Sequence, residues 1–297
     1  MKVIDILNNT DKAVFSFELV PPLKGGDINK IYEAIEPLIA LAPPFINITF
    51  HRDEVVYREY PDGTIKKVTV TKRPGSVALA AAIMRRYNVD MVPHIVCGGA
   101  TRHKIENELI DLNFLDIENV MALRGDPIPG ERFFTPEEGG HQYSCELVEQ
   151  ITRMNHGQYL DDTLTDAVPT NFCIGVAGYP EKHYEAPNQA CDIENLKKNV
   201  DAGANYIVTQ MFFDNEKFFS FVDRCRAAGI TVPIVPGLKP ISKASQLTLL
   251  PRVFHVDIPD MLVREIVKCK DDSQVKQVGI DWCTAQSLEL KACTYLY

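Results

Sequence analysis

The sequence lacks the features that would place a protein in a membrane or on a nucleic acid. No apolar run among its 297 residues approaches the roughly 20 residues needed to cross a bilayer. The first twelve residues lack the apolar core of a secretory signal. The formal net charge is −9, whereas a nucleic-acid-binding surface needs a basic face. We therefore expect a cytoplasmic protein that binds neither a membrane nor a nucleic acid.

The sequence also lacks paired cysteines. Its eight cysteines are widely spaced and include no CxxC pair, at positions 97, 145, 173, 191, 225, 269, 283 and 293. Disulfides are therefore not expected in this compartment. His94 and Cys97 are three residues apart on a predicted strand, so they point to opposite faces and do not form a metal site. We predict no metal.

A third absence is the string GxGxxG, which marks a dinucleotide site in a doubly wound sheet. Instead, seven apolar stretches each run into a polar or chemically capable residue. These residues are Glu18, Thr49, His94, Asp126, Tyr179, Gln210 and Lys239. In a parallel barrel the carboxyl ends of the strands meet at one mouth, where chemistry takes place. The pattern predicts one active site assembled from distant parts of the chain.

Helical patterns alternate with these strands, which is typical of parallel βαβ units. We predict helices over 28–41, 76–87, 143–154, 190–201, 215–228, 243–250, 259–269 and 273–290, and another that Thr101 caps. The closing stretch ACTYLY supplies an eighth strand. We therefore predict an α/β fold, a (β/α)8 TIM barrel forming a single domain over 1–297, with polar insertions near 51–73 and 155–171. An open doubly wound sheet is the alternative.

Glu18 is the residue whose surroundings indicate acid chemistry. It follows Phe15 and Phe17, and an apolar environment favours the neutral form of a carboxyl group and raises its pKa. A glutamate whose pKa is raised in this way acts as a general acid near neutral pH. The alternative is an ion pair at the rim of the barrel, and both interpretations stay open.

The other strand-end residues each have a structural alternative. Gly125 lets a ligand approach the backbone closely, although Arg124 and Asp126 on either side of it would also suit a loop salt bridge. His94 could equally be a hydrogen-bonded core residue. The Gln210 amide both donates and accepts, which suits the edge of a heterocycle. Lys239 suits a Schiff base or, more simply, a solvated rim.

Six blocks of the sequence resemble one family. They are SFELVPP at 16–22, PHIVC at 93–97, ALRGDPI at 122–128, VAGYPEKHYEA at 176–186, VDAGANYIVTQMFFD at 200–214 and VPGLKPIS at 235–242. In this order they resemble methylenetetrahydrofolate reductase. The resemblance implies an FAD-bearing barrel that passes a hydride from NAD(P)H to 5,10-methylenetetrahydrofolate by ping-pong kinetics, giving 5-methyltetrahydrofolate. It also implies a homo-oligomer.

The resemblance assigns roles to individual residues. Glu18 matches the general acid, and Asp126 the aspartate beside flavin and folate. Gln210 and Gln246 match substrate-binding glutamines. The FAD-binding positions fall on Thr49, His94, Arg124, Gly125, Asp126, Tyr143, Ser144, Tyr179, His183, Asp192 and Asn195.

The chain departs from the family pattern at several places. Segment 50–73 replaces a short Gly-rich stretch, Asn199 stands where a flavin-contacting lysine is common, and Leu250 stands near a usual aromatic. The sequence stops at TYLY without the basic residue that often follows the last strand. Two alternatives therefore stay open: a non-catalytic flavin- or folate-binding relative, and a Schiff-base lyase barrel that uses Lys239.

Overall fold

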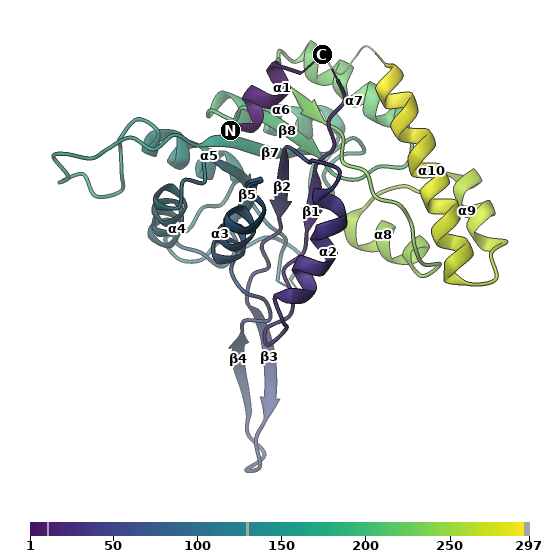
Figure 1. Cartoon of the computed structure of the whole chain (residues 1–297). Coiled ribbons are helices and arrows are strands. Elements are labelled where there is room, and N and C mark those ends of the chain that lie inside the picture. The colour runs from purple at the N-terminus through teal and green to yellow at the C-terminus, as the bar shows by residue number, and fades with distance from the viewer. Residues whose placement is uncertain (11, 129–130, 294–297) are drawn as a thin grey trace. The chain divides into compact units, whose positions relative to one another are not determined.

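The computed structural model describes residues 1–10, 12–128 and 131–293 (Figure 1). The chain forms two compact units. The first unit comprises Met1–Gly175 with Ala202–Ala204, and the second comprises Val176–Asp201 with Asn205–Tyr297. The prediction of a single domain stays a prediction.

The first unit is built on parallel strands. β1 (Phe17–Leu19) pairs with β2 (Phe45–Ile48), β2 with β5 (Asp90–Val96), and β5 with β6 (Asn119–Leu123). All four residues of β2 are buried, because a strand inside a parallel sheet is covered on both faces. The register places Glu18 opposite Asn47, and His94 opposite Met121. The carboxyl ends of these strands therefore share one edge.

The helices of the first unit are α1 (Val3–Asn8), α2 (Asn29–Ile39), α3 (Ser76–Tyr87), α4 (Arg102–Phe114) and α5 (Ser144–Met154). The Thr101 hydroxyl accepts a hydrogen bond from the Lys104 backbone N at 3.2 Å, so the predicted cap of α4 is confirmed. Asp27 accepts one from the backbone N of Asn29 at the start of α2, at 2.9 Å. Helix α1 was not predicted. It is one short helix of six residues, too short for a clear apolar period.

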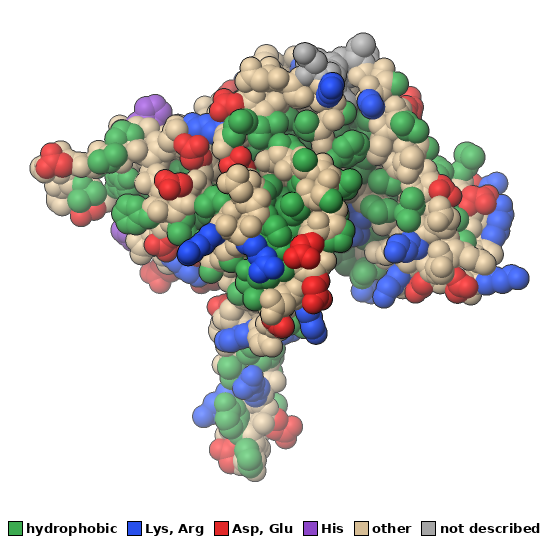
Figure 2. Space-filling view, viewed as in Figure 1, with side chains coloured by type: hydrophobic (Ala, Val, Ile, Leu, Met, Phe, Trp, Pro, Cys, Tyr) green, Lys and Arg blue, Asp and Glu red, His purple; other side chains and the backbone are tan. Residues whose placement is uncertain are grey.

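The segment 51–73 contains an antiparallel hairpin rather than an irregular polar excursion. β3 (Glu54–Glu59) pairs with β4 (Ile65–Val70), and the turn between them holds Pro61-Asp62-Gly63. Gly63 has φ +77°, which an Asp-Gly turn requires. Figure 1 shows this hairpin beyond the end of β2, and Figure 2 shows hydrophobic, basic and acidic side chains mixed on its surface. The second insertion, 155–171, contains neither helix nor strand.

The second unit continues the alternation of strand and helix. Its elements are β7 (Cys173–Gly178, which begins in the first unit), α6 (Gln189–Asp201), β8 (Tyr206–Thr209), α7 (Asn215–Ala227), β9 (Ile234–Val235), α8 (Gln246–Phe254), α9 (Asp260–Val267) and α10 (Asp272–Ala292). β8 and β9 pair in parallel, and the Gln210 backbone N donates to the carbonyl of Gly178 at 2.8 Å. The ends of β7 and β8 therefore lie together.

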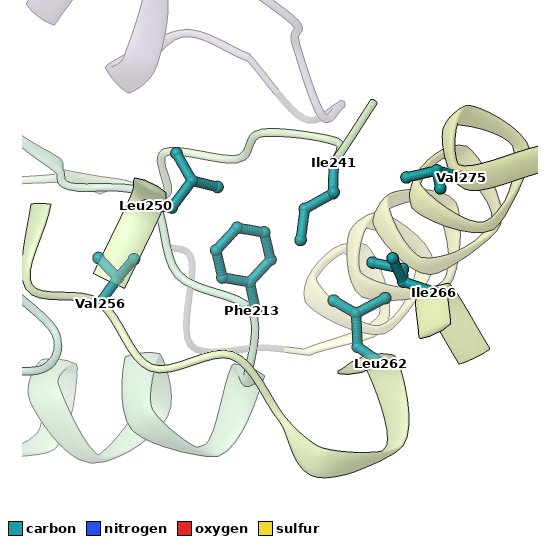
Figure 3. Packing of buried hydrophobic residues seen from close by; sticks show 7 residues of the cluster. All are labelled: Phe213, Ile241, Leu250, Val256, Leu262, Ile266 and Val275. Atoms are coloured by element: carbon teal, nitrogen blue, oxygen red, sulfur yellow. The ribbon is translucent and has the colours of Figure 1, made fainter. Parts of the chain in front are cut away.

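An apolar cluster fixes the last helices of the second unit. Phe213, just after β8, lies among side chains from α8, α9 and α10 (Figure 3). The buried members are Phe213, Ile241, Leu250, Val256, Leu262, Ile266 and Val275. Leu250, noted above as a departure from the family pattern, is 2% exposed and belongs to this cluster. Its side chain is therefore committed to packing.

The parallel α/β class is confirmed by this alternation. The predicted eighth strand falls largely on 294–297, outside the described residues. None of the helices in the described part of the chain is both long and apolar enough to cross a membrane. Within the same residues no group of three His, Cys, Asp or Glu side chains is placed to hold a metal ion. All eight cysteines are free thiols.

Candidate active site

Glu18 lies within β1, and its side chain is 57% exposed. Its Oε2 is 3.7 Å from Nε2 of His94 on β5. Phe15 is 63% exposed, so the aromatic neighbours do not enclose the carboxylate as the sequence suggested. Thr49, directly after β2, joins the same edge because its backbone N and hydroxyl both donate to the Leu19 carbonyl, at 3.0 and 3.3 Å.

His94 was predicted at the end of its strand, and that prediction is wrong by two residues, because β5 continues to Val96. The side chain is 7% exposed. Burial, with a smaller contribution from the charge of His51, lowers the pKa of His94 to about 4. The ring is therefore neutral at pH 7, and its contact with Glu18 is not an ion pair. Nε2 has no hydrogen-bond partner among the described residues, so this buried atom suits a polar group of a ligand.

The loop after β6 is held against the loop after β5. The Gly98 backbone N donates to the Arg124 carbonyl at 3.1 Å, and the Arg124 guanidinium lies over the Phe134 ring at 5.1 Å. The Arg52 guanidinium donates to the backbone carbonyl of Asp126 at 3.3 Å. The Asp126 side chain is exposed. The backbone of this loop is therefore fixed while its carboxylate faces solvent.

Gly125 is required by its backbone. Its φ is +88°, a left-handed conformation that L side chains rarely adopt. A Cβ atom there would lie 2.6 Å from Cγ1 of Val96. The structure thus shows a close approach of the Gly125 backbone to strand β5, and the predicted approach of a ligand stays a prediction.

Tyr143 and Ser144 lie at the start of α5. Oε2 of Glu146 accepts hydrogen bonds from the backbone N of Gln142 at 2.8 Å and of Tyr143 at 3.4 Å. Backbone N–H groups at the start of a helix have no carbonyl partner within the helix, and this carboxylate accepts hydrogen bonds from them instead. The Tyr143 side chain is 56% exposed and the thiol of Cys97 donates to its carbonyl at 3.8 Å. The backbone of Tyr143 is therefore held by hydrogen bonds, while its side chain is exposed.

In the second unit, the loop after β7 carries Tyr179 and His183 with their rings edge to face, 4.8 Å between centroids. The His183 backbone N donates to Oδ2 of Asp192 at 2.9 Å. His183 Nδ1 accepts from the backbone N of Glu185 at 3.2 Å, so a neutral ring carries its proton on Nε2. Burial raises the pKa of Asp192, against lowering by the His183 N–H and the charge of Lys182. The loop presents a donor and an aromatic edge.

Two further contacts fasten this loop to the segment between α8 and α9. The rings of Tyr184 and His255 stack at 4.7 Å with 23° between their planes. The Lys217 ammonium contacts Glu181 at 2.9 Å and also pairs with Asp257. The Asp257 backbone N donates to the same Glu181 carboxylate at 2.8 Å. We call Glu181, Lys217 and Asp257 the loop latch.

The remaining predicted residues of the second unit are engaged locally. Oδ1 of Asn195 accepts from Lys198 Nζ at 2.9 Å, and the Gln210 amide oxygen accepts from the Met211 backbone N at 3.0 Å. Oε1 of Gln246 accepts from the backbone N of Ser242 at 2.7 Å. The amide oxygens are thus occupied, that of Asn195 within α6, that of Gln210 just after β8 and that of Gln246 at the start of α8.

Three other polar residues, Asn199, Lys182 and Lys239, have defined positions. Asn199 is 8% exposed and donates to the Asn195 carbonyl at 3.3 Å. The Lys182 ammonium donates to the Ala186 carbonyl at 2.7 Å. Lys239 is exposed.

The structure therefore assembles the predicted residues as two groups, each within its own unit. Glu18, Thr49 and His94 share one edge in the first unit, and the Arg124–Asp126 loop is held at the ends of β5 and β6. Tyr179, His183 and Asp192 lie together in the second unit. Sequence reasoning gave no structural role to Arg52, to His255 or to the loop latch, whose members are 36 and 40 residues apart.

Comparison with known proteins agrees with these features. Residues 2–294 match the family model described as methylenetetrahydrofolate reductase. The chain is 32% identical over 305 aligned residues to methylenetetrahydrofolate reductase (NADH) 1 of Arabidopsis thaliana, covering 98% of this chain and 47% of that protein. It is 29% identical to 5,10-methylenetetrahydrofolate reductase of Pectobacterium carotovorum, covering 89% of this chain and 76% of that protein. The chain thus spans about half the length of the plant relative.

One solved structure shows the same fold. It is an uncharacterized protein from Clostridium thermocellum that binds two copies of 5-methyl-5,6,7,8-tetrahydrofolic acid. The TM-score is 0.54 at 13% identity, over 96% of this chain and 85% of that one. The predicted barrel class is thereby confirmed.

Proposed function

The chain belongs to the methylenetetrahydrofolate reductase family, and from this premise we propose that it reduces 5,10-methylenetetrahydrofolate to 5-methyltetrahydrofolate. NAD(P)H is the hydride source and FAD the cofactor, with ping-pong kinetics. The single observation that carries the proposal is the match over residues 2–294. The polar side chains at the strand ends of both units support it.

The proposed acid is Glu18. Hydride addition needs a carbon electrophile, and the bridging methylene of the substrate becomes one when its five-membered ring opens to an iminium. Opening breaks a carbon–nitrogen bond and leaves an electron pair on the departing nitrogen, which takes up a proton. Glu18 is exposed enough to meet a substrate and supplies this proton. The His94 ring beside it is neutral, and its Nε2 lies 3.7 Å from Oε2 of Glu18.

FAD is proposed to bind at the residues that the family resemblance assigns. A buried nitrogen of His94 that has no hydrogen-bond partner among the described residues suits a polar group of such a ligand. Thr49, Arg124, Tyr143 and Ser144 add hydrogen-bonding groups in the first unit. Tyr179, His183, Asp192 and Asn195 do so in the second. When bound, FAD would carry the hydride from the nicotinamide to the folate.

Asp126 and the two glutamines have proposed roles toward charge and substrate. The exposed Asp126 carboxylate disfavours negative charge nearby, so it would make a reduced cofactor a stronger hydride donor. Gln210 and Gln246 keep their amide N–H groups for substrate, because their oxygens are occupied by backbone N–H groups. We further propose a cytoplasmic homo-oligomer.

The testing experiment is the visible spectrum of the purified protein, followed anaerobically after addition of NADH or NADPH and then of 5,10-methylenetetrahydrofolate. Yellow protein that bleaches with a reduced nicotinamide and recovers its colour with the folate is the expected result. Bleaching without recovery would indicate a flavin-binding relative without folate reduction. Colourless protein that is trapped by borohydride at Lys239 would indicate the lyase instead.

A further inference from the structure

A polar cavity of about 240 Å³ lies in the first unit, and none of its lining residues is among those assigned above to flavin and folate. Its walls come from the start of α4, from α5 and from the insertion after α5. The volume exceeds the ~30 Å³ share of a single water several-fold. The arginine, glutamate and histidine residues of its lining are Arg102, Glu106, His141, Glu146, Glu149 and Arg153.

His141 is 3% exposed, and its tautomer follows from its neighbours. The Gln150 amide nitrogen donates to the Arg102 carbonyl at 3.0 Å, so the amide oxygen faces Nε2 of His141, at 2.5 Å. Nε2 must therefore carry the proton and donate. Burial, the largest cause, lowers the pKa of His141, which keeps the ring neutral near pH 7. Nδ1 is then a bare acceptor.

That acceptor faces another acceptor. Nδ1 of His141 has no hydrogen-bond partner among the described residues, and it lies 3.7 Å from Oε2 of Glu146. Two acceptors side by side repel each other unless a group with at least two N–H or O–H bonds lies between them. A protonated primary amine has three donors and a positive charge that the carboxylate attracts. A buried acceptor left unmatched costs about 1–3 kcal/mol, so filling this position is favourable.

The rest of the lining carries both signs of charge. Arg102 and Arg153 are exposed at the cavity, and Glu106, Glu146 and Glu149 oppose them. Glu106 is occupied by the Leu160 backbone N at 2.7 Å. With His141 neutral, the lining has three negative and two positive charges. Arginine forks match carboxylates in geometry as well as charge.

We propose that this cavity binds a small zwitterion of the α-amino acid class. Its ammonium lies between His141 and Glu146, and its carboxylate faces Arg102 and Arg153. The site does not depend on flavin or folate, so it stands or falls separately from the proposed reaction.

The test is isothermal titration and thermal unfolding of the whole protein with each of the twenty common α-amino acids. n-Butylamine and butyrate serve as probes with a single charge. We expect at least one amino acid to bind and to raise the melting temperature, and both single-charge probes to bind at least tenfold more weakly. Absence of binding by every amino acid at millimolar concentration, as for a cavity that holds water only, would overturn the proposal. Equal binding of n-butylamine would overturn the assignment of a zwitterion.

Two variants keep the test sharp. Glu146→Gln retains an amide oxygen that can still accept from the backbone at the start of α5, and we expect at least tenfold weaker amino-acid binding. Arg153→Gln changes an exposed side chain, so the fold is retained. This variant should weaken binding of the amino acid while leaving the affinity for n-butylamine unchanged. Glu138→Gln, an exposed carboxylate outside the lining, is the matched control. Wild-type affinity in both Glu146→Gln and Arg153→Gln would contradict the proposal.

Discussion

The two units hold their polar residues in different ways. In the first unit the carboxylates of Glu18 and Asp126 are exposed, while the backbone beneath them is fixed by hydrogen bonds and by Gly125. In the second unit His183, Asp192 and Gln246 are each engaged by a neighbouring backbone group, and the loop latch holds the loop after β7.

This difference between the units distinguishes side chains that take part in the reaction from side chains that position a ligand. A proton donor must reach its substrate and change its charge, so its carboxyl group must be accessible. A residue that positions a ligand acts best when its own conformation is already set. Changes in the first unit should therefore affect reaction rates, and changes in the second should affect stability and ligand retention.

The largest expected effect is that of Glu18→Gln. Removing a general acid typically costs about 10²–10⁴-fold. In anaerobic stopped-flow experiments we expect this loss in folate reduction, with flavin reduction by nicotinamide little changed. Because the side chain is exposed, the melting temperature should stay near that of the wild type. A comparable loss in both half-reactions would remove Glu18 from the acid role.

His94 is the exception in the first unit, because it is buried, and it predicts a pH dependence of stability. Its folded-state pKa is about 4, below the ordinary 6.5, so the unfolded chain binds the extra proton between these values. Stability is therefore full above pH 6.5 and falls as the pH drops toward 4, by up to about 3 kcal/mol.

The measurement is urea unfolding from pH 4 to 8 for the wild type and for His94→Gln, with His103→Gln on the exposed surface of α4 as the control. The free energy of unfolding should depend less steeply on pH in His94→Gln than in the wild type and in His103→Gln. Parallel curves for all three proteins would show that His94 does not take up the proton.

A substitution at Gly125 tests how tightly the backbone of the loop after β6 packs against strand β5. Gly125→Ala places a Cβ atom against Val96 at a left-handed φ, and we expect a loss of about 2–3 kcal/mol in the free energy of unfolding. Gly63→Ala in the hairpin turn has a similar φ, +77°, but no atom within 4 Å, so it should lose only about 1 kcal/mol. Chemical denaturation of both variants gives the difference that is due to packing. Equal losses would mean that Val96 moves aside.

Much of the fold was predictable because its signals are local. Apolar runs and caps located α3, the start of α4 and the ends of β7 and β8. The hairpin at 54–70 was predicted only as a polar insertion, because charged residues on both strands hide the alternation of side chains. The end of β5 was misplaced because His94 is polar, and polarity was used to mark the end of the strand.

The candidate site was predictable only in part. Residues at strand ends can be found from one segment at a time, but contacts between distant segments cannot. Nothing in the sequence near Arg52 indicates that it bonds to the Asp126 carbonyl, 74 residues away. The loop latch and the stack of Tyr184 on His255 are likewise contacts between separate loops.

The loop latch is the smallest effect and the one that tests the second unit. Burial is the main cause that raises the pKa of Glu181, and Lys217 is the main group that lowers it. Lys217→Met should therefore raise that pKa further and cost about 1–2 kcal/mol at pH 7, discounted because Lys217 is 32% exposed. Protonation removes the unpaired charge of Glu181, so the loss should shrink as the pH falls through the raised folded-state pKa and be gone below the ordinary value of 4.5.

Lys197→Met is the matched control, since Lys197 forms an exposed i,i+4 pair with Asp201 on α6 and should lose at most about 0.5 kcal/mol at any pH. Equilibrium dialysis of FAD against both variants extends the test from stability to function. If the latch positions Tyr179 and His183, Lys217→Met should release FAD several-fold more readily, while the rate of folate reduction at saturating FAD stays near that of the wild type. Unchanged FAD affinity together with slower folate reduction would contradict the assignment of reaction to the first unit and of ligand positioning to the second. The loop latch would then be acting on the chemical step.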